Sequence, residues 1–304
     1  MRRTRTPAAS GGPLATRFPA RFAARRVRRA LLGALLLAAL ATGAATAAPG
    51  DGPTPGAHAG PGHRPGGGCA ARDASLLFCE DFESLPRGGA ASLDWGVDTE
   101  HGTLTVERDR GRGHRQGQVL HVHTEDNGHA FLEADGFSAP GNSFFGRMWL
   151  RVAAFPTAPD WAHFTLVEAT GEGDGSVVRP IGGQYVPEVD GGTALWGVGS
   201  DGGPTGDWTD WRASAPATAG QWTCVEWEQD ASDNRISVWL DGRAQPDLTV
   251  TTTEHGGEPV DFVFPRFDTV RIGWQLYQPG STPGSYDVLL DDVALATHRL
   301  GCGS

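Results

Sequence analysis

The chain has 304 residues, and arginine supplies all 25 of its Lys and Arg residues, against 36 Asp and Glu. Nine of these arginines and no acidic residue fall within the first 47 positions, so the rest of the chain carries 16 basic and 36 acidic residues, a formal net charge of −20. A surface with that charge repels nucleic acid and anionic membranes, so we expect neither as a partner and predict a soluble monomer.

The first 47 residues predict a secretory signal peptide. Arginines precede the apolar run Ala30–Leu40, and small residues follow it up to Ala45-Thr46-Ala47. That order of charged, apolar and small residues is typical of a cleavable export signal. The alternative is a membrane anchor, which is disfavoured because a span needs ~20 apolar residues. We therefore expect a secreted, extracellular protein.

Residues 48–68 predict a disordered linker, because Pro, Gly and His dominate them and no apolar periodicity runs through them. His58 and His63 lie in this segment, and metal capture by the pair is the alternative to a plain disordered tail. Residues 69–304 remain for folding, a length that suits one all-β domain.

The four cysteines predict two disulfides, as is usual for an even number of cysteines in an exported chain. Three pairings are formally open. We favour Cys69–Cys79, which tethers the start of the domain, and Cys224–Cys302, which ties an inner strand to the carboxyl terminus. A thiol nucleophile or a zinc site has no supporting cysteine spacing here.

Short segments with period-two alternation follow one another along the domain, and helical periodicity is nearly absent. In chain order the predicted strands are Gln118–Thr124, Phe144–Val152, His163–Ala169, Cys224–Asp230, Arg235–Asp241, Val270–Tyr277 and Tyr286–Ala296. The turn-forming stretch 231–234 joins the fourth and fifth of these in a hairpin. The pattern predicts an all-β fold, a two-sheet antiparallel β-jelly roll of the concanavalin A-like sandwich kind.

The two ends of the domain predict a calcium site. The first apolar segment reads LFCEDFE from residue 77 and the last strand reads LLDDVAL from residue 289, and such strands commonly lie side by side in jelly rolls of this kind. Clustered carboxylates repel one another unless a cation lies among them, and their hard oxygens suit Ca²⁺. We expect Glu83 and Asp292 as side-chain ligands, with carbonyl groups of residues 113–115 as additions. The alternative is that these acids are solvated strand ends.

Three further motifs lie in the middle of the chain: PGNSFFGRMWLR at 140–151, DWAHF at 160–164 and RPIGGQY at 179–185. Together with CEDFE at 79–83 and LDDVAL at 290–295, they resemble the cellulose-induced secreted proteins of wood-degrading fungi and their actinomycete counterparts. Those proteins share a jelly roll related to glucuronan and alginate lyases. The resemblance covers roughly residues 79–302 and rests on several short motifs in the same order.

The resemblance implies a polysaccharide as partner and β-elimination beside a uronate as the reaction. That reaction needs a group to neutralise the sugar carboxylate, a base for the C5 proton and an acid for the leaving oxygen. The residues expected in these catalytic roles are His163, Arg179, Gln184 and Tyr185. Arg147 and Arg151, which project from one strand face, are expected to bind substrate, because the guanidinium fork suits a carboxylate.

The sequence also departs from the lyase pattern. Alginate lyases of this fold carry a Gln-Ile-His triplet on a central strand, and the nearest equivalent here is Gly183-Gln184-Tyr185. The base therefore stays open between His163 and Tyr185. His163 as a packed strand histidine, and Arg147 with Arg151 as ordinary partners of surface acids, are the competing interpretations.

Exposed aromatic rings that stack on sugars are expected at Trp208 and Trp211, in the polar stretch GDWTDWR, and at Trp161 beside His163. Packing of these loops over the sandwich is the alternative. His121 and His123 share a strand face at i, i+2 spacing and could line a groove or bind metal, but a wetted face is the favoured interpretation.

We predict a secreted β-eliminating lyase acting on a uronate polymer such as glucuronan. The alternative is a non-catalytic carbohydrate-binding protein secreted with plant-cell-wall-degrading enzymes. A glycosidase stays open because Glu226 and Glu228 share one strand face ~7 Å apart, between the retaining separation of about 5.5 Å and the longer inverting one. The sequence contains no Gly-x-Ser-x-Gly, Walker or His-Glu-x-x-His motif.

Overall fold

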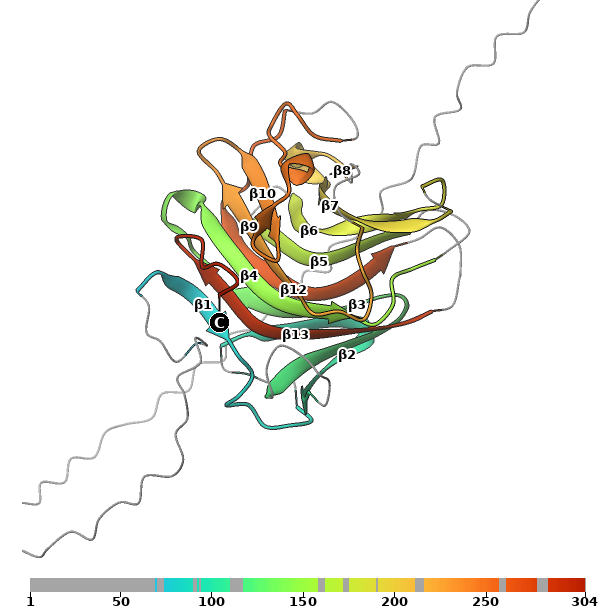
Figure 1. Ribbon diagram of the computed structural model, residues 1–304. Helices are drawn as coiled ribbons and strands as arrows, with labels where there is room; N and C mark the ends of the chain where they lie inside the picture. Colours follow the sequence, from blue (N-terminus) through green and yellow to red (C-terminus); the bar gives the residue numbers. More distant parts are fainter. Residues whose placement is uncertain are drawn as a thin grey trace, which may run out of the picture. The chain divides into compact units, whose positions relative to one another are not determined.

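The computed structural model in Figure 1 describes residues 69, 74–89, 92, 94–109, 117–157, 162–171, 175–189, 191–210, 216–256, 261–277 and 284–303. All of them belong to one compact unit, Pro61–Ser304. The expected signal peptide, the expected linker and the 113–115 loop lie outside the described residues. Within the described part of the chain, no helix has the length and apolar character needed to cross a bilayer.

Strands make up nearly all of the regular structure. They are β1 (Leu76–Glu80), β2 (Gly96–Arg108), β3 (Gln118–Asp135), β4 (Phe144–Val152), β5 (Ala162–Gly171), β6 (Val177–Val186), β7 (Thr193–Asp201), β8 (Trp208–Asp210), β9 (Thr223–Asp230), β10 (Arg235–Leu240), β11 (Arg243–Ala244), β12 (Phe267–Tyr277) and β13 (Ser285–Ala296). Single 3₁₀ turns occur at Pro140–Asn142, Gly203–Thr205 and Pro246–Leu248.

Two layers share the long strand β3, and every pairing between named strands is antiparallel. Residues 120–125 of β3 pair with β13, which continues through β4, β9 and β10 to β11; we call this the first layer. Residues 129–135 of β3 pair with β12, which continues through β5, β6 and β7 to β8; we call this the second layer. Strand β2 follows β3 along both parts. The predicted two-sheet jelly roll is confirmed.

Period-two alternation explains how each strand contributes to the core. In β4, alternate residues from Phe144 to Val152 are buried and the residues between them are half-buried. One apolar cluster takes side chains from the first layer, such as Met148 and Val225, and from the second, such as Phe164 and Ile272. Each large side chain removed from water in this way contributes about 1.5–3 kcal/mol to folding.

The first and last strands lie side by side, as the sequence predicted: β1 pairs with β13, and Cys79 is opposite Ala294. Both favoured disulfides, Cys69–Cys79 and Cys224–Cys302, are present. The hairpin formed by β9 and β10 is also confirmed, with Asp230 opposite Arg235 at its turn. These contacts fix the two ends of the domain to the first layer.

Candidate active site on the second layer

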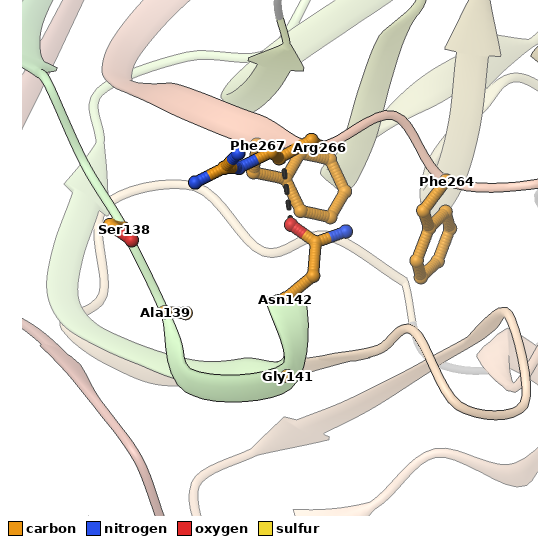
Figure 2. A pocket seen from close by; sticks show the side chains of 7 residues that line it. All are labelled: Ser138, Ala139, Gly141, Asn142, Phe264, Arg266 and Phe267. Carbon is orange, nitrogen blue, oxygen red and sulfur yellow. Dashed lines mark hydrogen bonds between the residues drawn. The ribbon is translucent and has the colours of Figure 1, made fainter.

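A pocket of about 400 Å³ opens at the end of the sandwich where β12 begins, and Figure 2 shows the residues that line it. One of its polar side chains, Asn142, is hydrogen-bonded within the fold at both ends of its amide. Asn142 Oδ1 accepts a hydrogen bond from the Phe267 amide at 2.9 Å, and its Nδ2 donates to the Pro265 carbonyl at 2.8 Å. The pocket therefore lies where the β3–β4 connection is joined to the start of β12. Arg266 lines it beside Asn142, but its lining residues include no histidine or tyrosine that could transfer a proton.

A row of charged side chains crosses the outward face of the second layer instead. Glu133 on β3 and Glu168 on β5 are the cross-strand partners of Arg271 on β12. Arg271 Nε lies 2.7 Å from Glu133 Oε2, and its Nη1 lies 3.3 Å from Asp98 Oδ2 on β2 and 3.8 Å from Glu168 Oε2. Burial raises the pKa of Glu168, and the charges of Arg271 and Arg179 oppose that rise. Three carboxylates thus surround one arginine in this part of the row.

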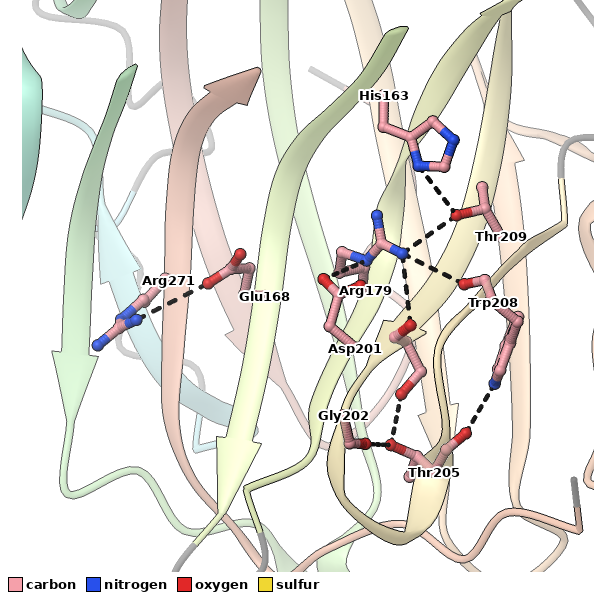
Figure 3. Close-up of polar contacts among 10 residues, drawn as sticks. His163, Glu168, Arg179, Asp201, Gly202, Thr205, Trp208, Thr209 and Arg271 are labelled. Atoms are coloured by element: carbon pink, nitrogen blue, oxygen red, sulfur yellow. Dashed lines mark hydrogen bonds and ion pairs between the residues drawn. The ribbon is translucent and has the colours of Figure 1, made fainter. Parts of the chain in front are cut away.

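Arg179 continues this row on β6, where it is 6% exposed. Figure 3 shows the guanidinium held by several groups. Its Nε forms an ion pair with Asp201 Oδ2 at 3.1 Å. Its Nη2 donates to the Trp208 carbonyl at 3.2 Å, the Ser200 carbonyl at 3.4 Å and Thr209 Oγ1 at 3.1 Å. Arg179 is therefore a fixed positive charge beneath this face.

His163 on β5 lies next to Arg179 through a shared hydroxyl. Thr209 Oγ1 is 3.5 Å from His163 Nδ1 and also accepts the hydrogen bond from Arg179, as Figure 3 shows. Desolvation by burial lowers the pKa of His163 to about 4, the charge of Arg179 lowers it further, and a hydrogen bond with Gln184 opposes the shift. Gln184 on β6 is the cross-strand partner of His163. His163 is therefore a neutral imidazole at neutral pH.

Tyr277 on β12 is directly opposite His163 on β5 and is 53% exposed. Cross-strand partners share one face of a sheet with their Cβ atoms about 5 Å apart, so Tyr277, His163 and Gln184 form one row of functional side chains. Tyr277 was not among the site residues predicted from the sequence. The sequence pattern that could have identified it is the alternation that puts Tyr277 on the same face of a predicted strand as Arg271 and Gln275.

Tyr185 does not join this row, although the sequence placed it with Gln184. Adjacent strand residues point to opposite faces, and Tyr185 pairs with the buried Ala162 and packs against the apolar core. A Cβ added to Gly192 would lie 2.1 Å from the Tyr185 hydroxyl oxygen, so that hydroxyl lies against the β6–β7 turn. The structure separates Tyr185 from His163.

The expected sugar-stacking face of Trp208 is not available. Trp208 is 3% exposed, stacks on Phe262 with ring centroids 5.4 Å apart, and donates from Nε1 to the Thr205 carbonyl at 2.8 Å. The prediction of an exposed platform there is wrong, because the short strand β8 turns this ring into the core. Trp161 and Trp211 lie outside the described residues.

Arg147 and Arg151 are on β4, in the first layer, and so lie away from His163. Arg147 Nη1 donates to the Gly301 carbonyl at 3.5 Å. The Arg151 guanidinium lies 5.4 Å from the Trp222 ring and 3.6 Å from Asp109 Oδ1. Both arginines therefore make contacts that stabilise the first layer, and a sugar bound beside His163 would not reach them.

Glu226 and Glu228 do not form a glycosidase pair. Glu226 is 1% exposed and binds Arg299 Nη2 at 2.6 Å and the Gly301 amide at 2.7 Å. Glu228 lies 3.4 Å from Arg235 Nη2. Each carboxylate is thus paired within the first layer, and Glu226 ties down the carboxyl terminus.

The neighbourhood of Glu83 offers the oxygen atoms that a calcium ion requires. Glu83 Oε1 accepts a hydrogen bond from the Gln118 amide at 2.9 Å. Gln118 Nε2 lies 2.9–3.1 Å from the carbonyl oxygens of Phe82, Glu83 and Leu85, three acceptors for two hydrogens. Asp292 is 4% exposed. The oxygen atoms around Glu83 fit Ca²⁺ in their chemistry, because Ca²⁺ takes six to eight such oxygens. Asp292, on β13, is the other expected ligand.

Comparison with known proteins identifies a matching family and similar solved structures. A family model of the polysaccharide lyase-like group, described as the Cip1-like core domain, matches residues 87–298. Among solved structures, the chain is similar to cellulose-induced protein Cip1, with 21% identity and a TM-score of 0.53 over 74% of this chain and 99% of that chain. This likeness shows the fold. No curated protein matches the chain.

Two more distant structures are similar in outline only. A sialidase shares 12% identity with a TM-score of 0.44, over 72% of this chain and 18% of that chain. The carbohydrate recognition domain of Emp47p shares 12% identity with a TM-score of 0.41, over 77% of this chain and all of the other. Likeness at this level supports no argument about the site.

Proposed function

The chain belongs to the polysaccharide lyase-like family of Cip1-like core domains, and from that membership we propose that it is a secreted lyase that cleaves a uronate polysaccharide by β-elimination. The row of Tyr277, His163 and Gln184 on the second layer supports this proposal best. It brings a neutral imidazole, a phenol and an amide to one outward face.

The two proton transfers divide between His163 and Tyr277. The neutral imidazole of His163 accepts the C5 proton, and the electrons of that C–H bond form the C4–C5 double bond. The glycosidic oxygen on C4 leaves with a proton from the Tyr277 phenol. Because both side chains start from one cross-strand pair, one sugar ring can contact both.

Negative charge develops on the sugar carboxylate as the C5 proton leaves, and this charge has to be stabilised. The amide of Gln184 is placed to donate to the carboxylate directly, and the fixed charge of Arg179 acts from beneath the face. Donors that are already oriented stabilise a transition state without having to reorganise, and the loss of one costs about 10²–10³ in turnover. Arg179 is oriented by Asp201 and by two backbone carbonyl groups.

The proposal is tested by incubating the protein with a panel of uronate polymers and following the ultraviolet absorbance of the unsaturated product. Polymer binding is measured in parallel for the wild type and Gln184→Ala. We expect Gln184→Ala to lower turnover by about 10²–10³ and to leave most of the binding. Polymer binding by the wild type without product, across the panel and a wide pH range, would contradict the lyase proposal.

A non-catalytic carbohydrate-binding protein is the second candidate, and one observation favours it. Both Arg179 and Arg271, which serve this face, are already paired with carboxylates of the protein, and the chain is acidic. That balance suits a neutral polysaccharide better than a polyanion. In that case, cellulose and other neutral polymers would bind more tightly than uronates, and no variant would change an enzymatic activity.

A further inference from the structure

Two histidines and an aspartate converge on the outward face of the first layer, away from the candidate active site. His121 and His123 alternate on β3, and Asp287 on β13 is directly opposite His123. Asp287 Oδ1 lies 2.7 Å from His121 Nε2 and 2.9 Å from His123 Nδ1. One ligand atom from each of the three residues lies within 4.8 Å of the other two. Two imidazole nitrogens therefore face the same carboxylate oxygen.

Further carboxylates face the other nitrogen of each ring. His123 Nε2 lies 3.0 Å from Glu125 Oε1, and His121 Nδ1 lies 3.6 Å from Glu107 Oε2 on β2. In metal centres, a carboxylate at the far nitrogen fixes the tautomer and orientation of a histidine ligand and makes it more basic. With a metal bound, the same arrangement would keep the proton of each ring on its outer nitrogen, beside Glu125 or Glu107, and leave the lone pair of the inner nitrogen for the ion.

We propose that His121, His123 and Asp287 bind a divalent transition-metal ion such as Zn²⁺. Two imidazole ligands suit Zn²⁺, Cu²⁺ or Ni²⁺, and Zn²⁺ also binds carboxylate oxygens, whereas Ca²⁺ and Mg²⁺ prefer oxygen ligands alone. The metal lies between the inner nitrogens and Asp287 Oδ1, in the place of the hydrogen bonds that join them.

The sheet gives this site a fixed backbone. Residues 285–290 of β13 pair in unbroken register with residues 120–125 of β3, so the three Cα positions are set by backbone hydrogen bonds. The side chains of His121, His123 and Asp287 are 28%, 33% and 44% exposed, so an ion can reach them from solvent. Three protein ligands leave at least one position of a tetrahedral zinc open to water or to an external ligand.

The chain has ten histidines, and those outside the cluster could also bind zinc. The test therefore starts from a reference protein that lacks the two linker histidines. His58→Ala with His63→Ala removes the two linker histidines from the full chain and keeps the folded domain intact. Zn²⁺ binding is measured by calorimetric titration, and bound zinc is counted by elemental analysis after dialysis. We expect one zinc per chain in this reference protein and a higher melting temperature with zinc.

Substitutions at the site decide the assignment. In the reference background, we expect His123→Ala and Asp287→Ala to lose the bound zinc, and Glu125→Gln to weaken binding about 10–100-fold. His298→Ala removes an exposed histidine elsewhere and should retain the zinc. Circular dichroism checks that each variant is folded, and Co²⁺ substitution gives a visible absorption spectrum that reports the ligands independently.

Two results would overturn the proposal. One is a reference protein that retains no zinc, which would leave the cluster as hydrogen-bonded histidines and acids only. The other is stoichiometric zinc that survives both His123→Ala and Asp287→Ala. These results do not depend on lyase activity, because the site lies in the first layer and His163 lies in the second.

Discussion

At the scale of single residues, the Thr209 hydroxyl connects the two groups on which the proposed chemistry depends. It accepts a hydrogen bond from Arg179 and lies against the imidazole of His163. Burial lowers the pKa of His163 most, and the nearby positive charge of Arg179 lowers it further, so the ring stays neutral. A neutral imidazole can accept a proton over a wide range of pH, although a low pKa makes it a weaker base.

The first prediction concerns the pH dependence of the reaction. An ordinary histidine base loses activity as pH falls through its usual pKa of about 6.5. Because the pKa of folded His163 is lowered to about 4, we expect kcat/KM to persist to about pH 5 and to fall as the ring protonates below that. NMR titration of His163 in the free protein measures the same pKa without substrate. A midpoint near the ordinary value in both experiments would exclude His163 as the buried neutral base.

The second prediction compares two tyrosines that differ in the face they occupy. Tyr277→Phe removes the proposed acid and should lower turnover by about 10²–10⁴, the usual contribution of a general acid. Tyr185→Phe removes a hydroxyl from the opposite face and should leave turnover close to that of the wild type. Both variants delete one oxygen from a strand tyrosine, so each is a control for the other. Equal losses of turnover in the two variants would contradict the division of roles.

At the scale of strands, the period-two alternation of the sequence predicts the bounds of some strands and the face on which their residues lie. The bounds of β4 follow from the sequence because every second residue from Phe144 to Val152 is uncharged and buried, whereas both arginines stand at the positions between them. By the same rule, Tyr185 and Gln184, which are neighbours in the chain, must point to opposite faces of the sheet. Their placement on different faces was therefore predictable from the sequence. The rule also places Tyr277 on the face of Arg271, and this residue could have been found from the sequence.

Other elements could not be predicted from alternation. Strand β6 contains Pro180, and its pairing with β7 shifts register between Arg179 and Gly182. Gly199 on β7 lacks a side chain where the guanidinium of Arg179 passes, since a Cβ there would lie 2.8 Å from Nη2. Strand β8 has three residues, too few for a periodic signal, and this is why Trp208 looked exposed. Long-range packing decides these positions.

The third prediction tests close packing within the first layer. A Cβ at Gly146 on β4 would lie 2.0 Å from Cζ2 of Trp227, which is fully buried. The rigid indole cannot move into solvent, so Gly146→Ala should lower the free energy of unfolding by about 1–3 kcal/mol. Gly89→Ala is the control, because a Cβ there has open space around it, and its effect should stay within about 0.5 kcal/mol. Urea denaturation gives both values. An unchanged midpoint for Gly146→Ala would show that the core has room for a methyl group beside Trp227 and would contradict the close packing.

At the scale of the whole molecule, the two layers separate the two proposed sites. The second layer presents the proposed proton-transfer row, and the first layer presents the proposed transition-metal site on its outward face. The ends of the domain are joined to the first layer by β1, by the two disulfides and by Arg299, which pairs with Glu226. A ligand that ties these ends together would therefore stabilise the fold without contacting His163.

The last prediction concerns the calcium site proposed at Glu83 and Asp292, which is based on the oxygen atoms gathered around Glu83. A ligand that binds only the folded state stabilises it by about 2.7 kcal/mol at a concentration one hundred times its Kd. For a domain of this size, that stabilisation corresponds to a rise of about 5–10 °C in melting temperature. Metal-free protein should melt lower by this amount, and added Ca²⁺ should restore the melt.

Because chelators also remove zinc, the calcium experiment is done in the His123→Ala background, where the proposed transition-metal site is disabled. In that background, Glu83→Gln should remove most of the response to Ca²⁺, since it replaces a charged ligand by an amide of the same shape. Glu188→Gln makes the same change at an exposed position in the β6–β7 turn and should keep the full response. If Glu83→Gln responds as strongly as Glu188→Gln, Glu83 is not a ligand. If the melt is the same with and without Ca²⁺, calcium does not stabilise the domain, and the acids at its ends are solvated, as the competing interpretation of the sequence holds.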